Sequence, residues 1–305
     1  MTEQSTTVSK IWHDQQQWSR AANRLKRGIR FWRSIALAFA ILGAILATAA
    51  TQAGLKSGLG QSLSIASAAM LAVAPGIQKT KLSQHAIESW TRARSASEGL
   101  KAEIYLYLTA TPPYNAADQD VKLTKKANKI KGAVDDLAGY TLRSPGVDND
   151  MPAVRGIDSY LNKRVQSQID GYYRKKADEN QRRLTLFRNI EFALGLAATL
   201  LSAIAAATHV GGFSAWVAVV TTIAAAITSH IAAERYEHLV VSYLATARQL
   251  ESITEEWLVG DDKSAEAAAK LVRGCEDVIS RENESWMAAW NKKQDKKKSL
   301  RVAQA

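Results

Sequence analysis

The sequence has few of the residues that characterise disulfide-stabilised proteins and enzymes. It contains one cysteine, Cys275, and five prolines in 305 residues. A single cysteine cannot build a disulfide framework, so nothing favours a secreted protein held together by disulfides. No glycine-rich phosphate-binding loop is present, and Cys275 has no evident base to activate it. We therefore expect a protein that is not an enzyme and that needs no cofactor.

Charge is also missing, from long stretches of the chain. Segments 34–55 and 59–78 contain no charged residue, and 192–233 has no Asp, Glu, Lys or Arg. A helix rises about 1.5 Å per residue, so ~20 residues cross a hydrocarbon core of ~30 Å. A soluble bundle with buried helices is the alternative interpretation. We predict four membrane spans, at about 34–54, 59–78, 191–208 and 213–233.

Positive charge lies almost entirely on one side of this two-hairpin topology. The formal net charge is +11, and 39 of the 40 Lys and Arg residues lie outside the hairpin turns, Lys56 being the exception. The positive-inside rule then predicts a multi-pass protein of the cell membrane with both termini cytoplasmic. Because the basic residues follow this topology and form no recognition module, we expect the lipid bilayer as partner and no nucleic acid.

The chain repeats itself after 153 residues. This shift superposes the two apolar hairpins without a gap and pairs Phe39 with Phe192. Beyond the hairpins the same shift pairs His85 with His238, Glu98 with Glu251, and Glu103 with Glu256. We predict an all-α integral membrane protein of two repeated units, 1–146 and 147–305. Each unit has a transmembrane helical hairpin and long cytoplasmic helices.

Small and hydroxyl-bearing side chains recur at intervals of three and four residues in the second and fourth spans, and so follow one helical face. The candidates for lining a pore are Gln61, Ser64, Ala68, Ala72, Ser214, Thr221, Ala225 and Thr228; Ala218 and Ala232 continue the second row. Hydroxyls can solvate ions or water, whereas small faces also allow close helix packing. We expect the second and fourth spans to face protein or an aqueous path, and the first and third to face lipid. We expect no Asp, Glu, Lys or Arg within the membrane, so a proton relay or a charge-coupled pump lacks its usual groups.

Three further features have weaker functional interpretations. Pro75 removes a backbone hydrogen bond in the second span, which gives either a gate hinge or a static bend. The lysine-rich segment 292–298 could contact anionic lipid, although a solvated tail is the ordinary explanation. Weak candidates for metal ligands, at a spacing of four residues, are His230, Glu234 and His238. We prefer a polar interfacial strip there and expect no metal, because a further clear donor is missing.

Two stretches resemble a known family. Residues 90–114 read W-x-R-A-R-S-A-S-E-G-L-K-A-E-I-Y-L-Y-L and end in Pro-Pro-Tyr, and 160–190 contains R-V-x-x-Q-x-x-x-Y-Y-x-x-K-A. They are similar to the SLATT group, the SMODS- and SLOG-associating two-transmembrane effector domains of bacteria, here as a tandem pair. The resemblance implies an inner-membrane effector of anti-phage or other conflict systems, triggered by a sensor protein or a nucleotide second messenger. No SLOG, TIR or cyclase domain is fused to it here.

Two functions remain from these observations. The first is an effector that forms a pore or permeabilises the membrane. Four spans are too few to enclose a wide path, so this function predicts a homo-oligomer. The alternative is a membrane-anchored helical scaffold or sensor that recruits cytoplasmic partners through its long helices. A mutation-sensitive face around Thr221 and Thr228 would favour the pore.

Overall fold

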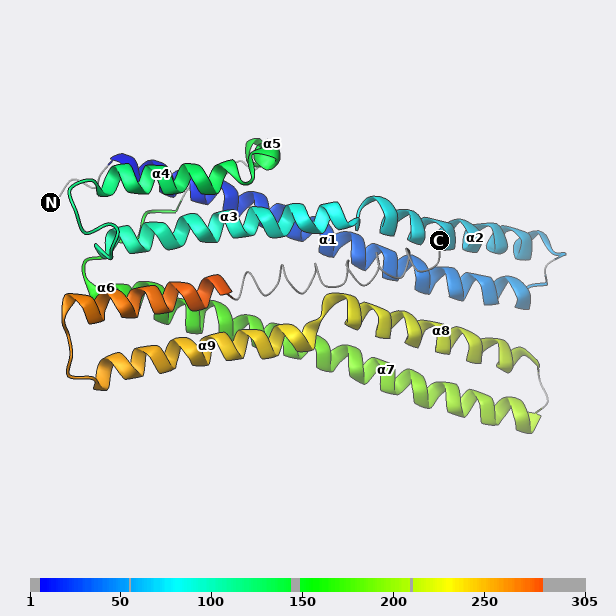
Figure 1. Ribbon diagram of the computed structural model, residues 1–305. Coiled ribbons are helices and arrows are strands. Elements are labelled where there is room, and N and C mark those ends of the chain that lie inside the picture. Colours follow the sequence, from blue (N-terminus) through cyan, green and yellow to red (C-terminus); the bar gives the residue numbers. More distant parts are fainter. Residues whose placement is uncertain (1–5, 55, 144–148, 209–210, 282–305) are drawn as a thin grey trace, which may run out of the picture. The chain divides into compact units, whose positions relative to one another are not determined.

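The computed structural model describes residues 6–54, 56–143, 149–208 and 211–281 (Figure 1). These residues form helices and turns, and no β-strand occurs among them. Four helical segments are long and apolar enough to cross a membrane: Thr6–Gln52, Gly58–Thr80, Ile157–Thr208 and Gly212–Val259. The predicted fold class, an all-α membrane protein, is confirmed.

The helix that precedes each hairpin continues directly into the first span of that hairpin. Helix α1 (Thr6–Gln52) contains no proline and runs without interruption. In the second half, α6 (Ile157–Tyr160), η2 (Leu161–Gln166), η3 (Ile169–Arg174) and α7 (Lys175–Thr208) follow one another as nearly continuous helix. The segments η2 and η3 are π-helical. Such turns are rare and widen a helix locally, and the sequence does not predict them.

The first hairpin turns tightly at small residues. Gly54 adopts a φ of +81°, which a glycine reaches without steric cost. Ser57 then caps α2 (Gly58–Thr80), because its Oγ accepts a hydrogen bond of 2.9 Å from the backbone N–H of Gly60. Helix α2 continues through Pro75 to Thr80.

In the second half, α8 (Gly211–Glu234) and α9 (Tyr236–Val259) are separate helices. Arg235 lies between them with a φ of +56°. A left-handed residue cannot continue a right-handed helix, so the chain changes direction there. The remaining helical elements are α3 (Gln84–Leu108), α4 (Gln119–Gly132), η1 (Asp135–Leu137), α5 (Ala138–Leu142) and the helix over 265–281.

The described chain forms two compact units, and each unit combines parts of both predicted repeats. The bundle unit contains 6–26, 87–177 and 241–281, and the membrane unit contains 27–86 and 178–240. The repeat therefore describes the order of elements along the chain, whereas the contacts group those elements differently.

Polar contacts connect the helices of the bundle unit to one another. Gln15 Nε2 on α1 donates a buried hydrogen bond of 2.9 Å to Ser97 Oγ on α3. Lys131 Nζ on α4 lies 2.6 Å from the Asp14 carboxylate on α1. Apolar side chains fill the space between these contacts, among them Trp18, Trp90, Leu100 and Ile104. This core holds together the helices that precede and follow the hairpins.

Hydrogen bonds and an ion pair connect the helices of the membrane unit, both within one hairpin and between the two hairpins. In the first hairpin, Ser67 Oγ donates a buried hydrogen bond of 2.8 Å to the carbonyl of Gly43. At the turn end of the unit, Gln52 Nε2 donates to the Gly212 carbonyl at 3.2 Å. At the opposite end, which we call the basic end, Arg33 pairs with Glu234 at 3.0 Å. The two hairpins of one chain thus contact each other at both ends.

Candidate functional site

The predicted polar stripe of α8 lies on the outside of the single-chain membrane unit. Its six members all have exposed side chains: Ser214, Ala218, Thr221, Ala225, Thr228 and Ala232. On the opposite face of α8, Val219 and Ile227 are buried. The row of small residues is therefore directed away from the chain's own core, toward lipid, water or another molecule.

The exposed face of α7 differs in kind from that of α8. It presents large apolar side chains: Leu186, Ile190, Phe192, Leu196, Leu200 and Ile204. Such a face suits lipid, because it removes large apolar area from water. On α8, Trp216 is the large apolar side chain that is comparably exposed. The two spans of this hairpin thus offer different surfaces to their surroundings.

The candidates of the second span are exposed as well. Gln61, Ser64, Ala68 and Ala72 all lie on the surface of the unit, and so does Pro75. The helix also exposes large apolar side chains such as Ile65 and Leu71, so its surface is mixed. The buried hydroxyl of this span is instead Ser67. Sequence reasoning missed its contact with Gly43, although a glycine opposite a serine in paired spans is a signal for close packing.

The hydroxyls on α8 already have partners within the chain. Thr221 Oγ1 donates to the carbonyls of Val217 and Ala218, in each case at 3.0 Å. Thr228 Oγ1 contacts the Ala224 carbonyl at 3.1 Å and also the carboxylate of Glu191 on α7. A hydroxyl that donates to its own helix keeps oxygen lone pairs free to accept from water. The stripe can therefore pack against protein or line a wet path.

Glu191 is the charged group that sequence reasoning left out of the third span. The apolar run was counted from Phe192, the next residue, and so its edge was set by composition alone. The contact with Thr228 places this carboxylate beside the α8 stripe, at the basic end of the unit. The predicted span 191–208 therefore begins with a charged residue, which a count from Phe192 leaves out.

Ion pairs hold the basic end together. Arg33 and Glu234 are both largely shielded from solvent, and Arg188 of α7 pairs with Glu237 of α9. Lys81 Nζ lies 5.6 Å from the ring centre of Trp32. A cation over an indole ring is held by the ring's quadrupole. These contacts fix the ends of the spans relative to one another.

The predicted strip of His230, Glu234 and His238 is divided among other contacts. Glu234 is engaged by Arg33, and His230 packs on Phe187 with a centroid separation of 5.1 Å. The left-handed Arg235 interrupts the helix, so His238 does not continue the face on which His230 lies. In the parts of the chain that the structure describes, no three His, Cys, Asp or Glu side chains are placed to hold a metal ion. The lysine-rich segment 292–298 lies outside the described residues.

The bundle unit contains a buried ion pair between η2 and the helix over 265–281. Arg164 Nε and Nη2 donate to the Glu276 carboxylate at 2.9 and 2.8 Å, and Tyr160 donates to the same carboxylate at 3.0 Å. The Arg164 guanidinium also lies 4.7 Å from the ring centre of Tyr105 on α3. Burial opposes the charge of Arg164, but the Glu276 carboxylate outweighs it and raises the pKa of the guanidinium.

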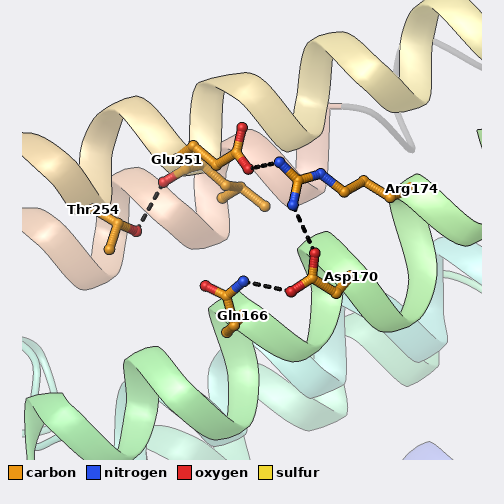
Figure 2. Close-up of polar contacts among 6 residues, drawn as sticks. Gln166, Asp170, Arg174, Glu251 and Thr254 are labelled. Carbon is orange, nitrogen blue, oxygen red and sulfur yellow. Dashed lines mark hydrogen bonds and ion pairs between the residues drawn. The ribbon is translucent and has the colours of Figure 1, made fainter.

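A second, exposed network joins η2, η3 and α9. Figure 2 shows Gln166 and Arg174 converging on Asp170, with hydrogen bonds of 2.5 and 2.8 Å. Arg174 also reaches Glu251 on α9. These contacts connect the π-helical segment η3 to α9. Exposed pairs of this kind contribute little stability, so their main effect is on orientation.

One pair of repeated glutamates, Glu98 and Glu251, has arginines as neighbours in both halves. Glu251 pairs with Arg174, and its counterpart Glu98 lies near Lys101, Arg94 and Arg164. Burial alone would raise the pKa of Glu98, but these three cations outweigh it and lower the pKa. At this one repeated position, both halves thus place a carboxylate beside cations.

Comparison with known protein families gives two matches. Residues 160–286 match the family described as SMODS and SLOG-associating 2TM effector domain 1. Residues 16–122 match a family of proteins of unknown function, DUF4231. The two matched segments contain one hairpin each, consistent with a tandem pair. No curated protein and no solved structure matches the chain.

Proposed function

We propose that this chain, of which residues 160–286 match the SLATT family, is a membrane effector that assembles into an oligomeric pore. The family describes a two-transmembrane effector domain, which supports an effector of bacterial conflict systems. The finer proposal is that several copies permeabilise the inner membrane when a sensor protein or a nucleotide second messenger signals infection. The distribution of Lys and Arg supports cytoplasmic termini.

One observation carries the pore proposal. The exposed surface of α8 consists of small and hydroxyl-bearing residues apart from Trp216, whereas the neighbouring α7 also exposes a row of large apolar side chains. A face of small residues gains little from lipid, and it permits close helix approach or solvates water.

The burial of the spans supports assembly from several copies. No more than 17% of the residues in any of the four apolar windows are buried within the chain. One chain therefore leaves most of its span surface to lipid or to other copies. Since four spans cannot enclose a wide path, we propose that further copies complete it.

Leakage from liposomes tests this function. We expect vesicles that contain the wild-type protein to release ions and a small dye, with and without added cyclic nucleotides as triggers. Thr221→Leu should reduce the release by about tenfold or more, because an apolar constriction dewets a narrow path.

The matched control is Thr199→Leu in α7. Thr199 is also exposed, and its hydroxyl also donates to its own helix, at 3.0 Å to the Gly195 carbonyl. It lies on the face of large apolar residues, so its replacement should leave leakage unchanged. Equal effects of the two variants would contradict a path lined by α8, and sealed wild-type vesicles in every condition would contradict the pore.

The alternative, a membrane-anchored scaffold or sensor, is favoured by the packed core of the bundle unit, in which even charged groups are buried. Under this function the hairpins only anchor the bundle. Replacement of both hairpins by unrelated ones of the same length should then preserve cellular activity. A pore would lose activity in the same experiment.

A further inference from the structure

Glu191, in the middle of α7 and at the basic end of the membrane unit, has a carboxylate that no Lys or Arg among the described residues neutralises. Its contact is with the hydroxyl of Thr228 on α8. We propose that Glu191 is the residue that makes the path selective for cations. This inference rests on the proposed pore and names the class of ion that the pore conducts.

Two other carboxylates of the membrane unit, unlike that of Glu191, form ion pairs with arginines. Glu234 pairs with Arg33 at 3.0 Å, and Glu237 pairs with Arg188. Within the described residues, no Lys or Arg side chain lies within ion-pair distance of Glu191. A hydroxyl stabilises a carboxylate by one hydrogen bond but leaves its negative charge in place. Glu191 thus retains a charge that the other two carboxylates share with arginines.

The position of Glu191 along α7 places that charge within the apolar layer. Helix α7 ends at Thr208, which is 17 residues beyond Glu191. At about 1.5 Å per residue this is roughly 26 Å, less than the ~30 Å of a hydrocarbon core. A charged side chain at that depth is costly unless it meets water or a partner, and such residues commonly mark ion pathways.

The partner of Glu191 belongs to the stripe from which the pore was proposed. Thr228 is an exposed member of the α8 face. The carboxylate therefore lies at the edge of that face, where the path would open at the basic end. There it would meet ions before they reach Thr221, which lies about two helical turns further toward the turn end.

The first hairpin has no equivalent group. The 153-residue shift places Ala38 at the position of Glu191 and Pro75 at that of Thr228. Each chain therefore supplies one such carboxylate, and an assembly of several chains supplies a ring of them. Rings of acidic side chains select cations, because they raise the local concentration of positive ions and repel anions.

The reversal potential in planar bilayers under a KCl gradient tests the proposal. We expect the wild-type protein to give a reversal potential close to that for K⁺. Glu191→Gln keeps an oxygen to accept from Thr228 and removes the charge. It should lower the ratio of K⁺ to Cl⁻ permeability by at least about fivefold, the effect of one unit charge near an ion in a wet path.

The matched control is Glu237→Gln, which removes an exposed carboxylate that is paired with Arg188. Its reversal potential should equal that of the wild type. If Glu191→Gln does not insert or conduct, Glu191→Asp takes its place, because it retains the charge. The Asp variant should remain cation-selective. An Asp variant without cation selectivity would overturn the proposal.

The outcomes separate this inference from the pore itself. Conducting channels with the same reversal potential in Glu191→Gln and the wild type would overturn the role of Glu191 and leave the pore standing. A wild-type protein that is incorporated in the bilayer but carries no current would overturn the proposed function, and this inference with it.

Discussion

Arg164 and Glu276 bring two opposite charges into the core of the bundle unit. Their side chains are 1% and 3% exposed, and Nη1 of Arg164 has no partner among the described protein atoms. A buried pair gains little over apolar residues, but the loss of one partner leaves an uncompensated charge. The pair therefore affects the stability of the protein most when one of its two partners is removed.

We predict that Glu276→Ala destabilises the protein by about 3–5 kcal/mol, because Arg164 then remains buried without a counter-charge. Glu251→Ala removes an exposed carboxylate from Arg174 and should cost no more than about 1 kcal/mol. Chemical unfolding of the detergent-solubilised protein, followed by circular dichroism, measures both. The double variant Arg164→Met/Glu276→Leu should recover most of the loss. A Glu276→Ala variant as stable as Glu251→Ala would contradict this account.

The sequence could not reveal this pair or the contact of Glu191. Arg164 and Glu276 lie 112 residues apart, and each looks like an ordinary charged residue of an amphipathic helix. Glu191 directly precedes an uncharged run, so its depth depends on where the helix ends, which composition does not fix. The exposed α8 stripe, in contrast, was predictable, since its spacing of three and four residues sets its face.

At the scale of the element, the first hairpin depends on close approach of its two helices. A Cβ built on Gly43 of α1 would lie 2.7 Å from side-chain carbons of Leu71 on α2. Nothing lies within 4 Å of a Cβ built on Gly195 of α7. The same substitution can therefore be compared at a tightly packed glycine, Gly43, and at an open one, Gly195.

We predict that Gly43→Val destabilises the protein by about 1–3 kcal/mol, because the added methyl groups force α1 and α2 apart and disturb the Ser67 hydrogen bond. Gly195→Val changes the same helix propensity without a clash, and serves as control. Thermal unfolding in detergent, measured for both, gives the difference. Equal losses of stability would indicate that propensity, and not packing, determines the effect.

Long elements were predictable from the sequence, but their irregularities were not. Charge-free runs of about 20 residues fix the spans, since few other structures tolerate them. The π-helical segments η2 and η3 carry no composition signal, because side-chain packing decides whether a helix widens. The break at Arg235 was also hidden, since no glycine, proline or asparagine marks it.

At the scale of the whole molecule, the placement of basic residues predicts the orientation in the membrane. Lys56 is exposed in the first turn, and Asp118 is exposed between α3 and α4. The positive-inside rule puts them on opposite sides of the bilayer. Since Cys275 is buried and is the single cysteine of the sequence, introduced cysteines can report on each side.

We predict that a membrane-impermeant maleimide labels Lys56→Cys in intact spheroplasts, in a Cys275→Ala background. Asp118→Cys should be labelled only after lysis, because its side of the membrane is closed to the reagent. Labelling is read as a mass shift on a gel. Asp118→Cys that reacts before lysis would reverse the proposed orientation.

The distance in sequence between Arg164 and Glu276 also sets an order of events during synthesis. At 5–20 residues per second the ribosome needs roughly 6 to 22 s to add the 112 residues that separate them. Both membrane hairpins are made before Glu276 emerges, while Arg164 still lacks its counter-charge. The nascent bundle thus cannot complete its core until the spans are available for insertion. Biosynthesis therefore favours membrane entry first and closure of the helical bundle afterwards.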